Sequence, residues 1–332
     1  VMATTVGDDN GDPAMARWTA FPYDSSAYTY DAAALKRKWA DLHAGDAEPL
    51  PKDDKVLAAW ALFHAGEFRK AFDAGLQAGG AGITVANKAQ AIYANYLEQS
   101  EKTRLAMFQE VATRAQAQAI AEPKNANAHY WLAYALGRYS QGISVAKALA
   151  QGLGSRVKTA LETTIALSPR HADAHIALGT FHAEVIDKVG SLLGRTQGAS
   201  KDAGIKNFKE ALRLHPNSAI AMVEYANGLV MLEGERRMKE AEQLYADAAY
   251  VGIHMGLPDK RGGFNGYGPA ALLKLARQPK DQQLSKRPLY DGTNTSAVRS
   301  NVLRTGVSEN NGLVAGPITV ANGASTPKKG GK

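Results

Sequence analysis

The spacing of apolar and polar residues predicts a series of helical hairpins between Asp54 and Gly252. Three segments of this region align without gaps, and each begins with a proline, at Pro123, Pro169 and Pro216. In each segment alanines follow three and five residues after the proline, a larger residue follows at six, and Leu or Tyr at nine. Proline ends a helix, and small residues at helical spacing allow close packing of the next one. The pattern predicts an all-α chain of about five hairpins.

Short polar residues mark the predicted starts of two of these helices. Asn125 and Ser218 are predicted N-caps, because their side chains can accept hydrogen bonds from free amides of the first turn. The prolines are 46 and 47 residues apart. This period is longer than two helices and a tight turn require. The extra residues fall in two stretches that contain glycines, 139–154 and 187–202, and these stretches carry apolar residues such as Ile143, Leu149 and Leu192. Each hairpin is therefore expected to have an enlarged turn.

These residues resemble the tetratricopeptide repeat, or TPR. In that family a large residue, then Leu, then Gly or Ala mark the first helix, and Ala, an aromatic residue, Ala and a closing Pro mark the second. Here the second set is clearest in Gly204, Phe208, Ala211 and Pro216. The usual TPR unit has about 34 residues, so the longer period also suits HEAT or armadillo repeats. The arrangement of small and aromatic residues favours a TPR-like solenoid with enlarged turns inside its hairpins.

Residues 129–181 as a whole are also similar to a narrower subgroup. It comprises the periplasmic TPR component associated with tripartite ATP-independent (TRAP) transporters and the related regulators of microtubule dynamics. The runs at 128–137 and 167–179 and the enlarged hairpin carry this resemblance, which extends over residues 123–249. It implies helices around a pore or groove and, for the transporter component, an assembly with a solute-binding protein. It implies no catalytic residues.

The two ends of the chain differ in composition from the predicted repeat domain, which spans residues 53–252. Residues 1–52 are predicted to form an N-terminal extension with one helix at 31–43, whose aromatic residues cover the first hairpins as a cap. Residues 253–332 form a Gly- and Pro-rich C-terminal extension with 12 Lys and Arg against 4 Asp and Glu. Within it we expect a short helix at 269–278 and two short apolar runs at 298–303 and 313–321. The aromatic residues of the cap are Trp18, Phe21, Tyr23, Tyr28 and Tyr30.

The absence of cysteine suits a compartment where thiols would be oxidised. We therefore expect a periplasmic or secreted bacterial protein, although a cytoplasmic one is not excluded. No apolar run is long enough to cross a bilayer. An export signal is either absent or already removed. The net charge of +7 resides in the tail, which serves either as a solvated extension or as an arm for an acidic partner.

Candidate chemistry is sparse. His171, His175 and His182 fall within one helix face, an arrangement that zinc can use, but no acidic or Cys partner completes the set. Repeat packing predicts His175 equally well, because His129 occupies the same place one repeat earlier. Gly190 and Gly194 lie in a segment one residue too short for a phosphate-binding loop. We expect no enzyme, no cofactor and no metal, and binding of nucleic acid is unlikely because the basic residues form no known module.

The sequence thus predicts a non-catalytic scaffold that binds a protein or peptide partner, as part of a larger envelope or extracellular assembly or as a homo-oligomer. The alternative is a periplasmic small-solute or lipid-binding accessory protein of a transport system. Partner-binding residues are expected on first helices near the enlarged turns, because these line the concave face of such a solenoid. The candidates are Tyr130, Trp131, Tyr134, Arg138, His182, Glu224 and Asn227.

Overall fold

The protein is an all-α chain of stacked helical hairpins, as the sequence predicts. The computed structural model describes residues 18–21, 25 and 28–254. Across these residues there are helices and turns but no β-strand. The short helix expected at 269–278 and the apolar runs at 298–303 and 313–321 lie outside the described residues.

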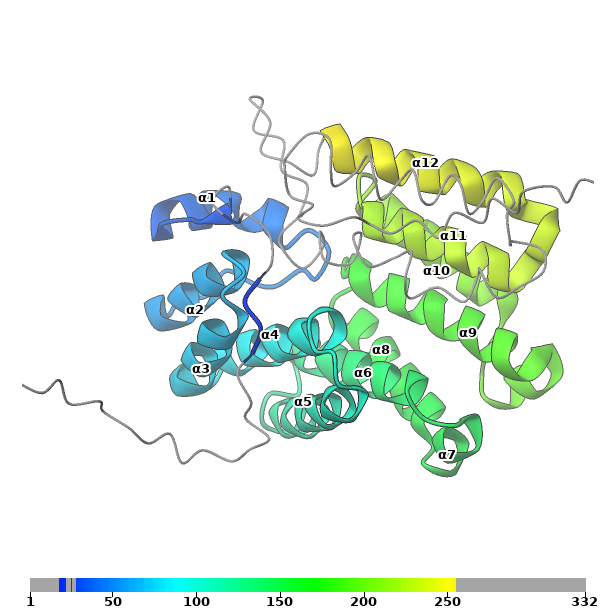
Figure 1. The fold of residues 1–332 in the computed structure, drawn as a ribbon, viewed down its shortest axis with the longest axis horizontal. Coiled ribbons are helices and arrows are strands. Elements are labelled where there is room, and N and C mark those ends of the chain that lie inside the picture. Colours follow the sequence, from blue (N-terminus) through cyan, green and yellow to red (C-terminus); the bar gives the residue numbers. More distant parts are fainter. Residues whose placement is uncertain (1–17, 22–24, 26–27, 255–332) are drawn as a thin grey trace, which may run out of the picture.

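Five antiparallel hairpins follow one another between Asp54 and His254 in the part of the chain that the structure describes, which confirms the expected repeat number. A preceding helix, α1 (Ala32–Leu42), packs beside the first hairpin. Figure 1 shows the hairpins side by side in a curved row, from α1–α3 at one end to α10–α12 at the other. The pairs are α2 (Asp54–His64) with α3 (Phe68–Ala78), α4 (Gly82–Tyr96) with α5 (Glu101–Ala121), α6 (Ala126–Gln141) with α8 (Leu153–Leu167), α9 (Ala172–Thr196) with α10 (Lys201–Leu214), and α11 (Ala219–Glu233) with α12 (Met238–His254).

The predicted helix starts are confirmed. Asn125 and Ser218 cap α6 and α11, and Asp31 caps α1; each side chain accepts a hydrogen bond from the amide three residues later. Helices α5, α8 and α10 all end two residues before a repeat proline. The cap satisfies an amide that has no partner within the helix, and the proline prevents the preceding helix from continuing. Local sequence therefore sets where these hairpins begin and end.

The enlarged turns are themselves helical. In the third hairpin a short extra helix, α7 (Val145–Ala150), lies between α6 and α8. In the fourth, α9 runs on past its neighbours and kinks at Gly190, whose φ of 79° favours a residue without a side chain. Residues 191–196 continue as helix after the kink. The added residues thus form two arms that project from the same side of the molecule (Figure 1).

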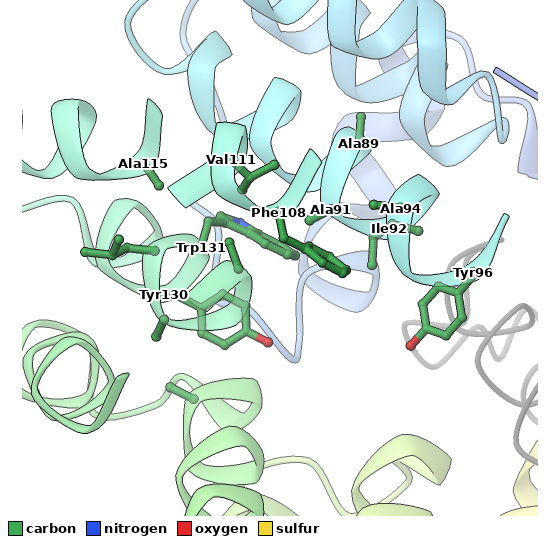
Figure 2. Packing of buried hydrophobic residues seen from close by; sticks show 14 of the residues in the cluster. Ala89, Ala91, Ile92, Ala94, Tyr96, Phe108, Val111, Ala115, Tyr130 and Trp131 are labelled. Atoms are coloured by element: carbon green, nitrogen blue, oxygen red, sulfur yellow. The ribbon is translucent and has the colours of Figure 1, made fainter. Parts of the chain in front are cut away.

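Close approach between helices depends on small residues. Phe208 of α10 lies between Gly179 of α9 and Gly228 of α11, where an added methyl group would overlap its ring. Figure 2 shows part of the same core between α4, α5 and α6, where alanines lie among larger buried side chains such as Phe108 and Trp131. Stacked units of this kind bury one continuous core.

Several N-terminal aromatic residues contact the first two hairpins. Trp18 stacks on Tyr93 of α4 with ring centroids 4.3 Å apart, and Phe21 contacts Phe68 of α3 edge-on at 6.1 Å. Tyr28 is buried in the core, and Tyr30 packs against it. Tyr23, the fifth member of the predicted cap, lies outside the described residues.

Candidate ligand groove

A cavity of about 370 Å³ lies on the concave side of the hairpin row. Its volume falls within the range of small-molecule and peptide-anchor sites. The first helices of all five hairpins contribute residues to its wall, from α2, α4, α6, α9 and α11, and α7 and α8 close one side. The prediction that inner helices line a groove is therefore confirmed for the described residues.

One side of the groove is an apolar slot between the third hairpin and α9. Its wall on one side comes from α7 and α8, and on the other from the middle of α9. Apolar side chains on facing helices provide a surface from which water is readily displaced. The slot is lined by Ile143, Val145, Leu149, Val157, Leu161, Phe181, Val185 and Val189.

The other side of the groove carries charged and hydrogen-bonding groups. The guanidinium of Arg138 lies over the ring of Tyr134, 5.3 Å from its centroid, and donates to Gln141 Oε1 at 3.0 Å. Gln141 in turn donates to Glu184 Oε1 at 2.8 Å, which links α6 to α9. Glu224 of α11 lines the same part of the cavity. The groove thus offers a cation, two carboxylates and an amide beside its apolar slot.

Five of the seven predicted partner-binding residues line this groove: Tyr130, Trp131, Tyr134, Arg138 and Glu224. Tyr130 and Trp131 are largely buried, and in Figure 2 the hydroxyl groups of Tyr130 and Tyr96 point toward the space between their helices. Trp131 also packs within the core, so it has a packing role and forms part of the groove wall at the same time.

His182 and Asn227 are not among the residues that line the groove. His182 Nδ1 accepts a hydrogen bond from the amide of Ser200 at 3.2 Å, beside the start of α10. Asn227 Oδ1 accepts one from the Tyr245 hydroxyl at 2.5 Å, between α11 and α12. Each side chain therefore links the two helices of its own hairpin. Their place on first helices was correctly inferred, but their direction around the helix depends on packing.

The three candidate zinc histidines each have other partners. His171 caps α9 through Nδ1, and its Nε2 is 2.9 Å from Asn127 Oδ1. His175 Nε2 lies 3.3 Å from the carbonyl of Pro169, and His129 Nε2 lies 3.1 Å from that of Pro123. The repeat therefore uses histidine twice for the same structural contact. No cluster of three potential ligands is found among the described residues.

The sequence did not foresee that residues 43–48, after α1, would pack against the inner helices and contribute Gly45 and Asp46 to the groove wall. The amide of Asp173 donates to the carbonyl of Gly45 at 2.9 Å, and Asn127 Nδ2 donates to the carbonyl of Asp46 at 3.0 Å. Ala47 adopts a left-handed conformation with φ of 48°, which is unfavourable for a residue with a side chain. The contacts of this segment with α6 and α9 offset that strain.

A buried ionic network holds the segment in place. The Lys88 ammonium is 2.5 Å from one oxygen of Asp46, and His43 Nδ1 is 2.8 Å from the other. His43 Nε2 is 3.2 Å from His64 Nε2, and Lys88 lies 5.3 Å above the ring of Trp60. Lys88 is the only charged residue of α4. A single charge in an otherwise uncharged helix is the signal that could have pointed to a buried partner.

Burial changes the protonation of this network. The pKa of Asp46 is well below its ordinary value: burial alone would raise it, but the charges of Lys88 and His43 and their hydrogen bonds outweigh that effect. Burial lowers the pKa of His64, and the neighbouring His43 lowers it further. Burial raises the pKa of Glu48 to about 8, assisted by the charge of Asp46. Glu48 is therefore protonated at neutral pH, whereas Asp46 is ionised.

Fold and groove together define an all-α helical-hairpin repeat protein with a ligand-sized cavity on its concave side. The sequence model of the family described as regulator of microtubule dynamics protein 1-3 matches residues 84–249, half of the chain. The chain belongs to this family. The match begins in α4 and ends in α12, so it includes most of the groove-lining helices. No individual curated protein sequence matches the chain significantly.

The family match corrects one expectation. The similarity of residues 129–181 to the periplasmic component of TRAP transporters was wrong as a family assignment, because the matching family is that of the regulators of microtubule dynamics. The two groups share a helical-hairpin pattern, which explains why the motifs alone did not separate them. No helix among the described residues is both long and apolar enough to cross a membrane.

Proposed function

We propose that this protein is a non-catalytic scaffold that binds a segment of a protein partner in its concave groove. The observation that carries the proposal is that the inner helices at the groove wall already bind a piece of polypeptide, residues 43–48, of which Gly45 and Asp46 line the groove. Two donors from different inner helices, Asn127 Nδ2 and the amide of Asp173, bind carbonyl groups of this segment. Backbone carbonyls are common to every peptide, so such contacts give affinity, while neighbouring pockets select side chains.

The remainder of the groove is suited to the side chains of a partner. The apolar slot between α8 and α9 would take an aliphatic or aromatic anchor, and burial of such anchors supplies most of the binding energy at protein interfaces. Arg138 and Glu224 on the polar side would pair with charged or amide groups and so determine orientation.

Site-specific photo-crosslinking in the native host would test the proposal. A benzoyl-phenylalanine at Gln141, an exposed residue of the groove wall, should form an adduct with a discrete protein. The same residue at Ile120, which is exposed on α5 and is not part of the groove, is the matched control. Adducts that are equally abundant from both positions, or no adduct from position 141, would contradict the proposal.

A second candidate function is the binding of a small apolar molecule, such as a lipid. The observation that favours it is the apolar slot itself, whose facing walls are made of aliphatic and aromatic side chains. Native mass spectrometry of the purified protein separates the two candidates. A bound small molecule that is lost in a Val157→Trp variant would support the second candidate, and the ligand-free mass would count against it.

Two expectations carry over as parts of the proposal. We propose that the protein is not an enzyme, because the groove offers donors, acceptors and apolar walls that suit binding. The periplasmic or secreted location stays a prediction from the lack of cysteine. Cell fractionation of the native host would test it.

A further inference from the structure

The two arms carry exposed apolar side chains: Leu192 and Leu193 belong to neither the core nor the groove, whereas Val145 and Leu149 line the groove and also reach solvent. Leu192 is 83% exposed, and Leu193, Val145 and Leu149 are 45%, 42% and 41% exposed. Val145 and Leu149 belong to α7, and the two leucines belong to the part of α9 that follows the kink at Gly190. These four make up half of the large apolar residues that stand out as exposed in the described part of the chain. We call them the arm residues.

The two arms lie on the same side of the molecule. Leu149 of α7 and Val189, which directly precedes the kink of α9, line a common cavity. Since Val145 and Leu149 also reach solvent, the cavity opens to the surface beside α7. Figure 1 shows both arms extending beyond the row of hairpins in the same direction. A flat surface could therefore touch both at once.

Cations outnumber anions around the arm residues. Residues 142–158 and 187–202 contain six Lys and Arg and two acidic residues, Asp187 and Asp202. Three of these cations pair with carboxylates from outside the two stretches: Lys158 with Glu162, Lys188 with Glu184, and Lys201 with Glu233. The other three are exposed and form no ion pair within the described residues: Lys147, Arg156 and Arg195.

We infer that the two arms form a docking edge for the surface of an anionic lipid bilayer. The arm residues would enter the region between headgroups and acyl chains, and Lys147, Arg156 and Arg195 would contact acidic headgroups. Apolar side chains flanked by cations are the combination that partitions to such an interface. A stable interface with a protein partner buries about 800 Å² per side. Four side chains on two short arms present much less than that.

The absence of cysteine gives a direct test with full-length protein. A Leu192→Cys variant, labelled with a polarity-sensitive fluorophore, would be mixed with vesicles of phosphatidylcholine containing about one quarter phosphatidylserine. We expect a blue shift and increased emission, and quenching by lipids with a spin label high on the acyl chain. An Ile120→Cys variant is the matched control, because Ile120 is 73% exposed but lies on α5 away from the arms. Its label should not respond.

Substitutions then separate the apolar and electrostatic contributions. In vesicle flotation, Leu192→Glu with Leu193→Glu should weaken binding at least tenfold. Removal of Lys147, Arg156 and Arg195 should weaken it by about fivefold per cation on anionic vesicles. The matched triple variant at Lys102, Lys124 and Lys209, which are exposed elsewhere, should have a smaller effect. Circular dichroism would verify that every variant is folded.

Several results would overturn the inference. If the full-length chain does not float with anionic vesicles, the arms do not dock to bilayers. If binding is abolished by salt but is unchanged in the arm variants, the basic residues after His254 are responsible. If the Leu192 label responds only to higher protein concentration, without vesicles, the arm residues form a contact between copies of this chain.

Discussion

Glu48 provides the sharpest test of how residues 43–48 pack against the inner helices, because it is 9% exposed and lies beside an ionised carboxylate. Burial raises its pKa from 4.5 to about 8. The native state therefore holds a proton that the unfolded chain releases above pH 4.5. Stability from this group is fully present below pH 4.5, falls as pH rises, and is lost once the pH exceeds about 8. Each pH unit in this window costs about 1.4 kcal/mol.

Replacement of Glu48 by Gln removes the titration and keeps the shape. The Gln carbonyl can still accept the hydrogen bond that Asn127 Nδ2 donates to Glu48 Oε2. The free energy of unfolding of Glu48→Gln should exceed that of the native chain by about 1 kcal/mol at pH 5, about 3 kcal/mol at pH 7 and about 5 kcal/mol at pH 9. Urea unfolding followed by circular dichroism at these three pH values measures the difference.

The difference between variant and native chain is the quantity to follow, because other buried groups titrate in the opposite sense. Burial lowers the pKa of His171 and of His182 to about 4, so stability from these histidines is lost as pH falls from 6.5 toward 4. The native chain and the Glu48→Gln variant share this dependence on histidine protonation, so it cancels in the stability difference between them. A stability difference that stays constant from pH 5 to 9 would refute the assignment of the proton to Glu48. Glu235→Gln, at an exposed position, is the matched control.

Two further substitutions test the packing of the repeat body. Lys88→Met should lower the free energy of unfolding by about 3–5 kcal/mol, because it leaves the buried Asp46 carboxylate without its counter-charge. Adding Asp46→Asn should restore much of the lost stability. Denaturation of the single and double variants would show whether the two effects are coupled. Gly228→Ala should lower the free energy of unfolding by about 1–3 kcal/mol, because the added methyl group would overlap Phe208. The methyl group of Gly137→Ala meets no atom within 4 Å, so this variant should stabilise α6 by about 0.5–1 kcal/mol. Equal thermal midpoints for these two variants would contradict the packing described.

Much of the fold could be predicted because its signals are local. A repeat proline, a polar cap and a set of alanines each act within one or two helical turns. This is why Asn125 and Ser218 were correctly identified as caps and why the number of hairpins was right. The shared structural role of His129 and His175 could also be predicted from the sequence, because each contacts the carbonyl of the proline six residues earlier. The TRAP assignment failed for a related reason, since local motifs are shared among hairpin repeats.

The groove was only partly predictable. Helix membership placed Tyr130, Arg138 and Glu224 on the concave side, but the same reasoning also selected His182 and Asn227, which face the second helix of their own hairpins. Which side of a helix meets the groove depends on the angle at which successive hairpins stack. That angle is set by close contacts such as those of Phe208 with the glycines on either side. No single segment of sequence contains this information.

By itself, then, the sequence determined the helices, their caps and breaks, and the two enlarged turns, because hydrogen bonds and side-chain contacts within a helical turn act between residues close in the chain. Only the tertiary structure decided that residues 43–48 pack at the groove wall, where Asp46 meets Lys88 from 42 positions away. It also decided that both arms project from the same side of the molecule. Such contacts form because burial of apolar surface stabilises complementary surfaces however far apart they lie in the sequence.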